Sequence, residues 1–183
     1  MLKLKSQLPA CLLIIMLFLL SSCNIYDYSS GKKAAYENVD LFYQAAGICL
    51  KYDLQHPIEN KILNEQEVKS IPKEEQEVFK KCINNLVNNI DVEGGDADTG
   101  SYEYIVISLW TIGAYQGVIF VPPEFDEEDV TRLLYYRTSE SEKDVELIEL
   151  KDNFYYYFMT GDRVQEELPP HTYPSGKLVW NEK

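Results

Sequence analysis

The side chains able to carry chemistry in this chain are four cysteines, two histidines and thirty acidic residues. His56 and His171 stand far apart, and neither a His-x-x-x-His nor a Cys-x-x-Cys spacing occurs, so the sequence predicts no zinc site. Residues 96–100, DADTG, begin like a calcium loop but lack the bidentate glutamate at the required distance. No Gly-x-Ser-x-Gly motif marks a nucleophile. We therefore predict that the protein is not an enzyme and holds neither a metal nor a cofactor.

The first segment of the chain has the layout of an export signal. A basic start, residues 1–5, precedes an uncharged apolar run, residues 10–20, which ends in two serines directly before Cys23. A basic region, a short apolar run and small residues are typical of a secretory signal peptide. The run has about half of the roughly 20 residues that a membrane-spanning helix needs, so a permanent span is the weaker interpretation.

The end of this segment, Leu20-Ser21-Ser22-Cys23, resembles the lipobox of bacterial lipoproteins. The resemblance covers only residues 1–24. It implies cleavage before Cys23, transfer of diacylglycerol to its thiol and acylation of the new amino terminus, and such multiple acyl chains anchor a protein firmly. Asn24, where an aspartate would signal retention in the inner membrane, implies the periplasmic side of the outer membrane. The alternative is an ordinary signal peptide in which Cys23 is incidental.

Two cysteines remain once Cys11 leaves with the signal and Cys23 is acylated. Cys49 and Cys82 both fall on apolar stripes of predicted helices, and an oxidising periplasm allows such a pair to close. A bridge enclosing a loop of about 33 residues would stabilise the fold by roughly 3 to 4 kcal/mol. We therefore predict a disulfide between them that joins helix to helix, with two buried free thiols as the alternative.

The mature chain is strongly acidic. Removal of residues 1–22 takes away two lysines and no acid, which leaves 15 basic and 30 acidic residues and a formal charge of −15. This charge argues against nucleic acid and against an anionic leaflet as partners, so we expect membrane contact only through the N-terminal lipid. A basic protein partner would be attracted. The alternative is that the acidity only keeps an exported domain soluble.

The segment VPPEFDEEDV, residues 121–130, is the best candidate for a partner-binding surface. Its prolines stiffen the chain, its acids would steer a basic partner, and its one aromatic ring would be the buried contact. The predicted partner-binding residues are Glu124, Phe125, Asp126, Glu127, Glu128 and Asp129. The alternative is a helix start, in which Asp126 caps the helix and the next three acids fill a favourable first turn.

Apolar spacing predicts helices first and strands afterwards. Residues 36–52 and 73–90 carry apolar residues at helical spacing, and residues 91–100 separate them from the next region. Five segments beyond this break are rich in aromatic and β-branched residues, as strands are, and a sixth closes the chain: 102–112, 115–121, 132–137, 145–150, 154–159 and, more weakly, 177–180. This order predicts an α+β domain whose N-terminal helices pack on one face of an antiparallel β-meander sheet.

The predicted layout of the whole chain therefore has three parts. Residues 1–22 are the signal peptide, 23–35 a lipidated tether, and 36–183 a single α+β periplasmic domain. The predicted strand 154–159, FYYYFM, is apolar or aromatic on both faces, as is 104–112. An antiparallel sheet usually has one polar face. Either the domain covers both faces of these strands, or the second face is an interface.

Two functional hypotheses follow. The first is a lipid-anchored inhibitor or immunity protein that neutralises a basic toxin or wall-degrading enzyme in the periplasm. In general character the chain resembles the small periplasmic lipoproteins that serve as immunity partners of type VI secretion effectors, on composition and address rather than on a motif. The second hypothesis is a structural or assembly lipoprotein of the envelope, and the aromatic faces of the sheet favour it.

Overall fold

The computed structural model describes residues 28–94, 103–111, 114–138, 144–160 and 178. The predicted signal peptide, Cys23 with its proposed lipid, the first part of the predicted tether and His171 lie outside the described residues. So does the predicted strand 177–180, apart from Leu178.

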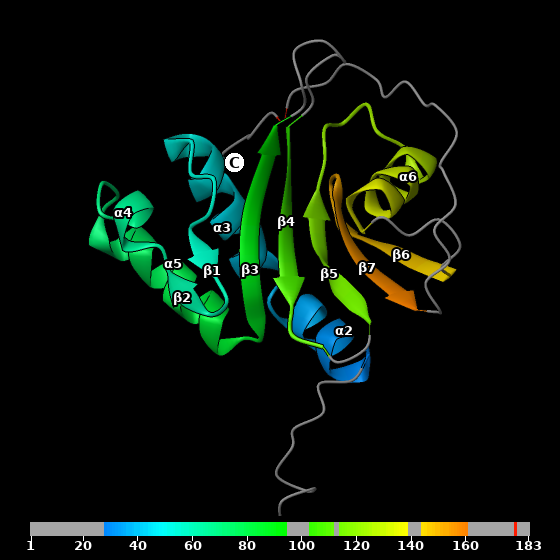
Figure 1. Cartoon of the computed structure of the whole chain (residues 1–183), viewed down its shortest axis with the longest axis horizontal. Helices are drawn as coiled ribbons and strands as arrows, with labels where there is room; N and C mark the ends of the chain where they lie inside the picture. Colours follow the sequence, from blue (N-terminus) through cyan, green and yellow to red (C-terminus); the bar gives the residue numbers. More distant parts are fainter. Residues whose placement is uncertain (1–27, 95–102, 112–113, 139–143, 161–177, 179–183) are drawn as a thin grey trace, which may run out of the picture.

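The described strands form one seven-stranded sheet with the order β2-β1-β3-β4-β5-β7-β6, and every neighbouring pair is antiparallel (Figure 1). The predicted α+β class with an antiparallel sheet is confirmed. The predicted strands 102–112, 115–121, 145–150 and 154–159 correspond to β4, β5, β6 and β7. The strand bounds are Ile58–Glu59 (β1), Ile62–Leu63 (β2), Val87–Gly94 (β3), Glu103–Leu109 (β4), Tyr115–Phe120 (β5), Asp144–Lys151 (β6) and Phe154–Thr160 (β7).

Helices from the N-terminal half cover one face of the sheet, which we call the closed face. They are α2 (Tyr28–Glu37), α3 (Val39–Tyr52) and α5 (Lys73–Asn84), with the short α4 (Glu65–Val68) beside them. In Figure 1 the strands pass in front of α3. Phe42 and Phe79, from α3 and α5, are fully buried in one cluster with Ile105, Ile107 and Tyr156 of the sheet.

On the opposite face, which we call the open face, the described residues form one helix, α6 (Glu127–Thr138). Val130, Leu133 and Leu134 of α6 form a second buried cluster with strand residues that include Tyr155 and Tyr157. Both faces of the aromatic strands are therefore covered within the domain. The first of the two explanations for the two-sided apolar pattern is confirmed.

The predicted tether is wrong from Tyr28 onward, because α2 begins there and packs on the sheet. Small residues bring this helix close: a side chain at Gly31 would place a Cβ 2.0 Å from Gln116 Oε1. The ring of Tyr28 lies 4.5 Å from that of Phe158. Because α2 buries mainly Gly31 and two alanines, its composition resembled a flexible segment.

The second predicted helix, 73–90, is too long. α5 ends at Asn84, and Leu86 adopts a left-handed backbone conformation with φ of 69° before β3 begins. The register of β3 against β4 shifts between Val87 and Asn89, which is a β-bulge. The extra residue places Val87 and Ile90 three positions apart on the same buried face, so a strand imitated helical spacing.

The predicted strand 132–137 is also wrong, because these residues form the second half of α6. Leu133 and Leu134 face the sheet, whereas Tyr136 is 72 % exposed. The alternative interpretation of the preceding acids, a helix start, is confirmed. The aromatic and branched residues of 132–137 suggested a strand. The acids that precede them cap a helix instead, and this helix continues through 132–137.

Candidate functional site

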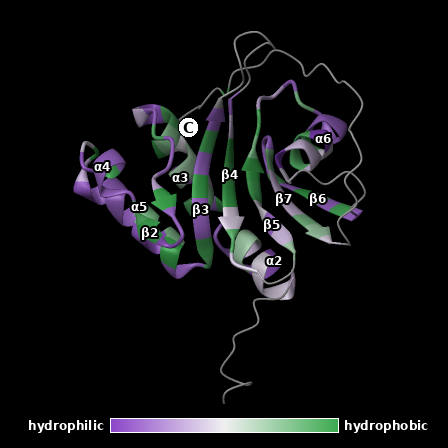
Figure 2. Cartoon of the chain, in the orientation of Figure 1, coloured by the Kyte–Doolittle hydropathy of each residue, from purple (hydrophilic) through white to green (hydrophobic). Residues whose placement is uncertain are grey.

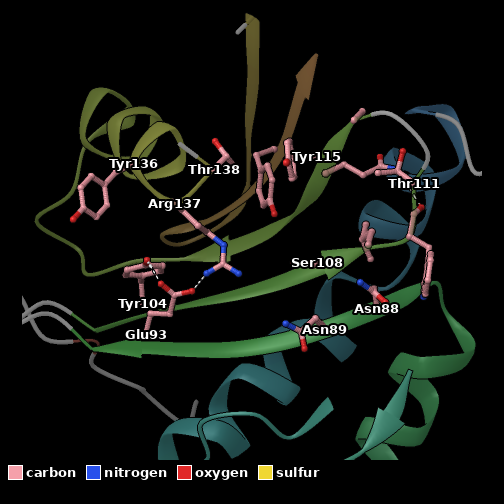
Figure 3. Close-up of a pocket in the computed structure, with 15 residues that line it drawn as sticks. Asn88, Asn89, Glu93, Tyr104, Ser108, Thr111, Tyr115, Tyr136, Arg137 and Thr138 are labelled. Carbon is pink, nitrogen blue, oxygen red and sulfur yellow. Dashed lines mark hydrogen bonds and ion pairs between the residues drawn. The ribbon is translucent and has the colours of Figure 1, made fainter. Parts of the chain in front are cut away.

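A groove of about 720 Å³ lies on the open face, between β3–β4 and the C-terminal part of α6. Figure 3 shows Arg137 pointing from α6 toward Glu93, with Tyr104 near one end of the groove and Asn88 and Thr111 near the other. Among the described residues, α6 alone packs on this face, and it does not cover the whole width of the sheet. Strands β3 and β4 supply the floor of the groove where α6 does not reach.

Arg137 joins the two walls of the groove. Its Nη2 donates to Asp91 Oδ2 at 3.0 Å, and its Nη1 pairs with Glu93 Oε1. The hydroxyl of Tyr104 donates to the other oxygen of Glu93 at 2.5 Å. The guanidinium group therefore holds α6 to β3 through two carboxylates, each of which already has internal partners.

The carboxylate of Asp91, beside the groove, contacts three side chains. Its Oδ1 lies 3.0 Å from His56 Nδ1, and the side-chain amide of Asn89 donates to Oδ2 beside the guanidinium. Asp91 is buried, at 7 % exposure, so these partners replace the water that it loses. They leave little capacity for an additional cation.

Three polar atoms of groove residues are buried without a hydrogen-bond partner in the described part of the chain. They are the side-chain oxygens of Asn88 and Asn89 and the indole nitrogen of Trp110. Asn88 occupies the bulge of β3, and the backbone N–H of Trp110 donates to Leu86 O at 2.9 Å, just before β3 begins. A buried polar group without a partner costs about 1–3 kcal/mol, so these atoms mark a place where a ligand can gain hydrogen bonds.

Tyr157, which lines the groove, lies close to Gly117. A Cβ at Gly117 would lie 2.4 Å from Ile107 O and 2.9 Å from the Tyr157 hydroxyl oxygen, so no other residue fits without movement. Tyr157 is buried, and its burial raises the pKa of the phenol, while a hydrogen bond with Ser108 acts in the opposite direction. The phenol is therefore a neutral part of the floor at physiological pH.

A smaller hollow of about 380 Å³ lies between the start of α2 and the edge strand β6. There the Lys32 ammonium contacts Glu146 Oε1 at 2.7 Å, and the Tyr28 hydroxyl donates to Oε2 at 2.5 Å. The hydrogen bonds with Lys32 and then Tyr28 lower the pKa of Glu146. This group ties α2 to the sheet and has a structural role.

Only some side chains of the predicted partner-binding segment are exposed as predicted. Phe125 is 4 % exposed and belongs to the core under α6, so its proposed role as an exposed anchor is wrong. Asp126 accepts from the Asp129 N–H at 2.9 Å, and Asp129 Oδ2 accepts from the Asp126 N–H at 3.3 Å. This reciprocal cap fixes the start of α6. The segment still presents Glu124, Asp126, Glu127 and Glu128 as exposed acids, with Asp129 partly exposed.

The predicted disulfide between Cys49 and Cys82 is not present, and both residues are buried free thiols. The predicted placement is right, because α3 and α5 pack together and both thiols belong to the core of the closed face. Burial raises the pKa of Cys82 to about 12 and raises that of Cys49 further. Such thiols are protonated and unreactive at neutral pH, and the alternative of two buried free thiols describes this structure.

The groove residues were missed by the sequence analysis. Asn89, Asp91 and Glu93 alternate along β3 with the buried Ile90 and Val92, which is the signal of a strand with one polar face. The bulge concealed this signal, because it extended the helical pattern of α5 to Ile90. The sequence pattern predicts a strand over residues 132–137, whereas Arg137 belongs to α6 and contacts Asp91 and Glu93 of β3.

The described residues contain no grouping of three or more His, Cys, Asp or Glu side chains able to hold a metal ion. Across the same ranges, none of the helices combines the length and the apolar content needed to cross a membrane. Compared with known proteins, the chain matches no protein-family model, no curated protein and no solved structure.

Proposed function

We propose that this chain is a lipid-anchored binding protein on the periplasmic side of the outer membrane, where it neutralises a basic toxin or wall-degrading enzyme. The lipobox-like Leu20-Ser21-Ser22-Cys23 supports the address. The formal charge of −15 after residue 22 supports a basic partner. The proposal involves binding alone and no catalytic step.

The observation that carries the proposal is the acidic patch at the start of α6, formed by Glu124, Asp126, Glu127, Glu128 and Asp129. Residues 121–131 contain these five acids and no basic residue. The nearest base, Arg132, pairs with Glu128 at 3.0 Å. Because the cap and the burial of Phe125 hold the patch in place, it presents negative charge to a partner without a cost of ordering.

The feature that favoured a structural or assembly role, an aromatic sheet face open to a partner, is not observed among the described strands. That hypothesis depended on an aromatic sheet face available to another protein. Tyr155 and Tyr157 face α6, and Tyr156 faces the N-terminal helices, so all three rings are buried inside the domain. We therefore retain the binding protein as the proposed function.

The test compares two triple variants that remove the same charge. Glu124→Gln/Glu127→Gln/Glu128→Gln neutralises the patch, and Glu59→Gln/Glu65→Gln/Glu74→Gln neutralises three exposed acids elsewhere. Each is expressed in cells whose periplasm receives the product of any neighbouring gene that proves toxic there. We expect the wild type and the second variant to restore growth and the first to fail. Equal protection by both variants would show that the patch does not bind the toxin.

The proposed location at the membrane has a separate test. Cys23→Ser should move the protein from the membrane fraction to the soluble fraction and prevent incorporation of radiolabelled palmitate, because the lipid would have no thiol to attach to. Cys11→Ser, within the predicted signal peptide, is the matched control and should change neither result. Continued sedimentation of Cys23→Ser with membranes would remove the basis of the proposed location.

A further inference from the structure

The groove on the open face has the volume of a ligand site. Pockets for small ligands measure about 300–1,000 Å³, and this one holds about 720 Å³. It lies against the C-terminal part of α6, at the other end of the helix from the acidic patch. A ligand in the groove would therefore leave the patch accessible.

The charged side chains of the groove are already paired with one another, so they do not favour a charged ligand. Both oxygens of Asp91 and both oxygens of Glu93 already have internal partners, and the cation between them is Arg137. An anionic ligand would have to compete with two carboxylates for the guanidinium group. A cationic ligand would have to displace it. The groups that remain to be satisfied are neutral.

The unmet hydrogen bonds identify the type of ligand group. Within the described ranges, Asn88 and Asn89 each have a buried side-chain oxygen without a donor, and Trp110 has a buried indole N–H without an acceptor. A hydroxyl group supplies both functions, since it donates one hydrogen bond and accepts two. A ligand with several neighbouring hydroxyls fits two acceptors and one donor that line the same groove.

Aromatic rings at the groove provide surfaces for the apolar faces of such a ligand. Tyr136 lines the groove and is 72 % exposed, which is unusual for a large side chain in the described part of this domain. Trp110 also lines the groove, and the Lys61 ammonium lies 4.8 Å from the centre of its ring. Flat rings with a few fixed polar atoms are the lining that small-molecule sites use for orientation and affinity.

We propose that this groove binds a neutral saccharide, with Asn88, Asn89 and Trp110 bonding its hydroxyls and Tyr136 contacting a ring face. The inference goes beyond the proposed function and does not depend on it. Saccharide binding and toxin neutralisation use opposite ends of α6. Either one can therefore fail without the other.

The test uses calorimetry on the full-length chain in a zwitterionic detergent, because a glycoside detergent would itself present a saccharide. The probes are the trimer of N-acetylglucosamine and maltotriose, with pentalysine as a cationic competitor. We expect one of the two saccharides to bind with a stoichiometry of one, and pentalysine not to displace it. Asn89→Ala and Trp110→Phe should each weaken binding by about two- to tenfold, because each removes one hydrogen bond to a neutral ligand.

Asn84→Ala is the matched control. It makes the same change as Asn89→Ala at an exposed position on α5, away from the groove, and should leave saccharide affinity unchanged. Trp110→Phe removes the indole N–H while keeping an aromatic ring, and circular dichroism checks that both groove variants remain folded. The proposal is overturned if neither saccharide binds at about 10 mM, if both groove variants bind as wild type does, or if pentalysine displaces the saccharide.

Discussion

The two faces of the sheet differ in how completely the chain covers them. Three helices, α2, α3 and α5, close one face over an apolar core that contains Phe42 and Phe79. Among the described residues, α6 alone packs on the other face (Figure 1), and the groove lies between this helix and the strands β3 and β4. The comparison separates stability from function: the closed face holds the fold together, and the open face has room for a ligand.

The sequence of β3 encodes this difference. Figure 2 shows the strand banded in purple and green, and its residues alternate between the two faces. Ile90 and Val92 enter the closed core, whereas Asp91 and Glu93 point to Arg137 on the open face. A strand with apolar residues on both sides, such as β7, needs helices on both sides. β3 needs them only on one.

The largest expected effect comes from breaking the closed face. Phe79→Ala removes a fully buried ring from the core between α5 and the sheet. The lost burial and the resulting cavity should reduce the free energy of unfolding by about 3–5 kcal/mol. Urea denaturation followed by circular dichroism measures this change. A loss below about 1 kcal/mol would show that the closed face is not the main source of stability.

The two thiols of the closed face predict a pH dependence. Burial raises the pKa of both above the ordinary 9.0, that of Cys82 to about 12. The folded state therefore keeps protons that the unfolded state releases, so this contribution is complete below pH 9 and is lost as pH rises toward the folded values. We expect a loss of about 2–3 kcal/mol by about pH 10. The double variant Cys49→Ala/Cys82→Ala should show a shallower alkaline slope, and an unchanged slope would contradict the assignment.

The polar network of the open face should contribute less. Asp91→Ala removes the carboxylate that His56, Asn89 and Arg137 share, and we expect a loss of about 1–2 kcal/mol in the free energy of unfolding. The control is Asp40→Ala, whose carboxylate contacts Lys151 at 3.1 Å on an exposed surface. Exposed ion pairs contribute about 0–1 kcal/mol. If both variants lost the same stability in urea denaturation, the network would be no more than a surface contact.

The smallest effect is expected at the rim of the groove. Tyr136→Ala removes a ring that is 72 % exposed, so the free energy of unfolding should change by less than about 0.5 kcal/mol. The same variant should weaken saccharide binding, measured by calorimetry as above. A large loss of stability would mean that the open face is packed more like the closed one than the structure indicates.

Much of the fold could be predicted from the sequence because its signals are local. The aromatic and branched residues of 145–150 and 154–159 predicted two strands, and these form the last hairpin, β6–β7, with Asn153 at φ of 58° between them. The acids at the start of α6 gave two conflicting predictions, and the capping interaction between Asp126 and Asp129 decided in favour of the helix. Such features can be predicted from the sequence because capping and turn geometry depend on neighbouring residues.

The remaining features depend on contacts between distant residues. The bulge at Asn88 is defined by the register against β4, so the sequence of β3 alone resembled a helix. α2 is helical although its composition resembles a linker, because Gly31 lets it approach Gln116 of β5. The groove unites residues of β3, β4 and α6, and none of them carries a motif. Tertiary contacts decided each of these cases.

The position of Tyr28 sets a distance limit for the anchored protein. α2 begins at Tyr28, five residues after Cys23. A fully extended chain of that length spans at most about 18 Å. In the lipoprotein proposed above, the folded domain would therefore be held close to the lipid headgroups instead of reaching across the periplasm. A toxin would have to arrive at the bilayer surface to be captured, and one that acts deep in the cell wall would escape.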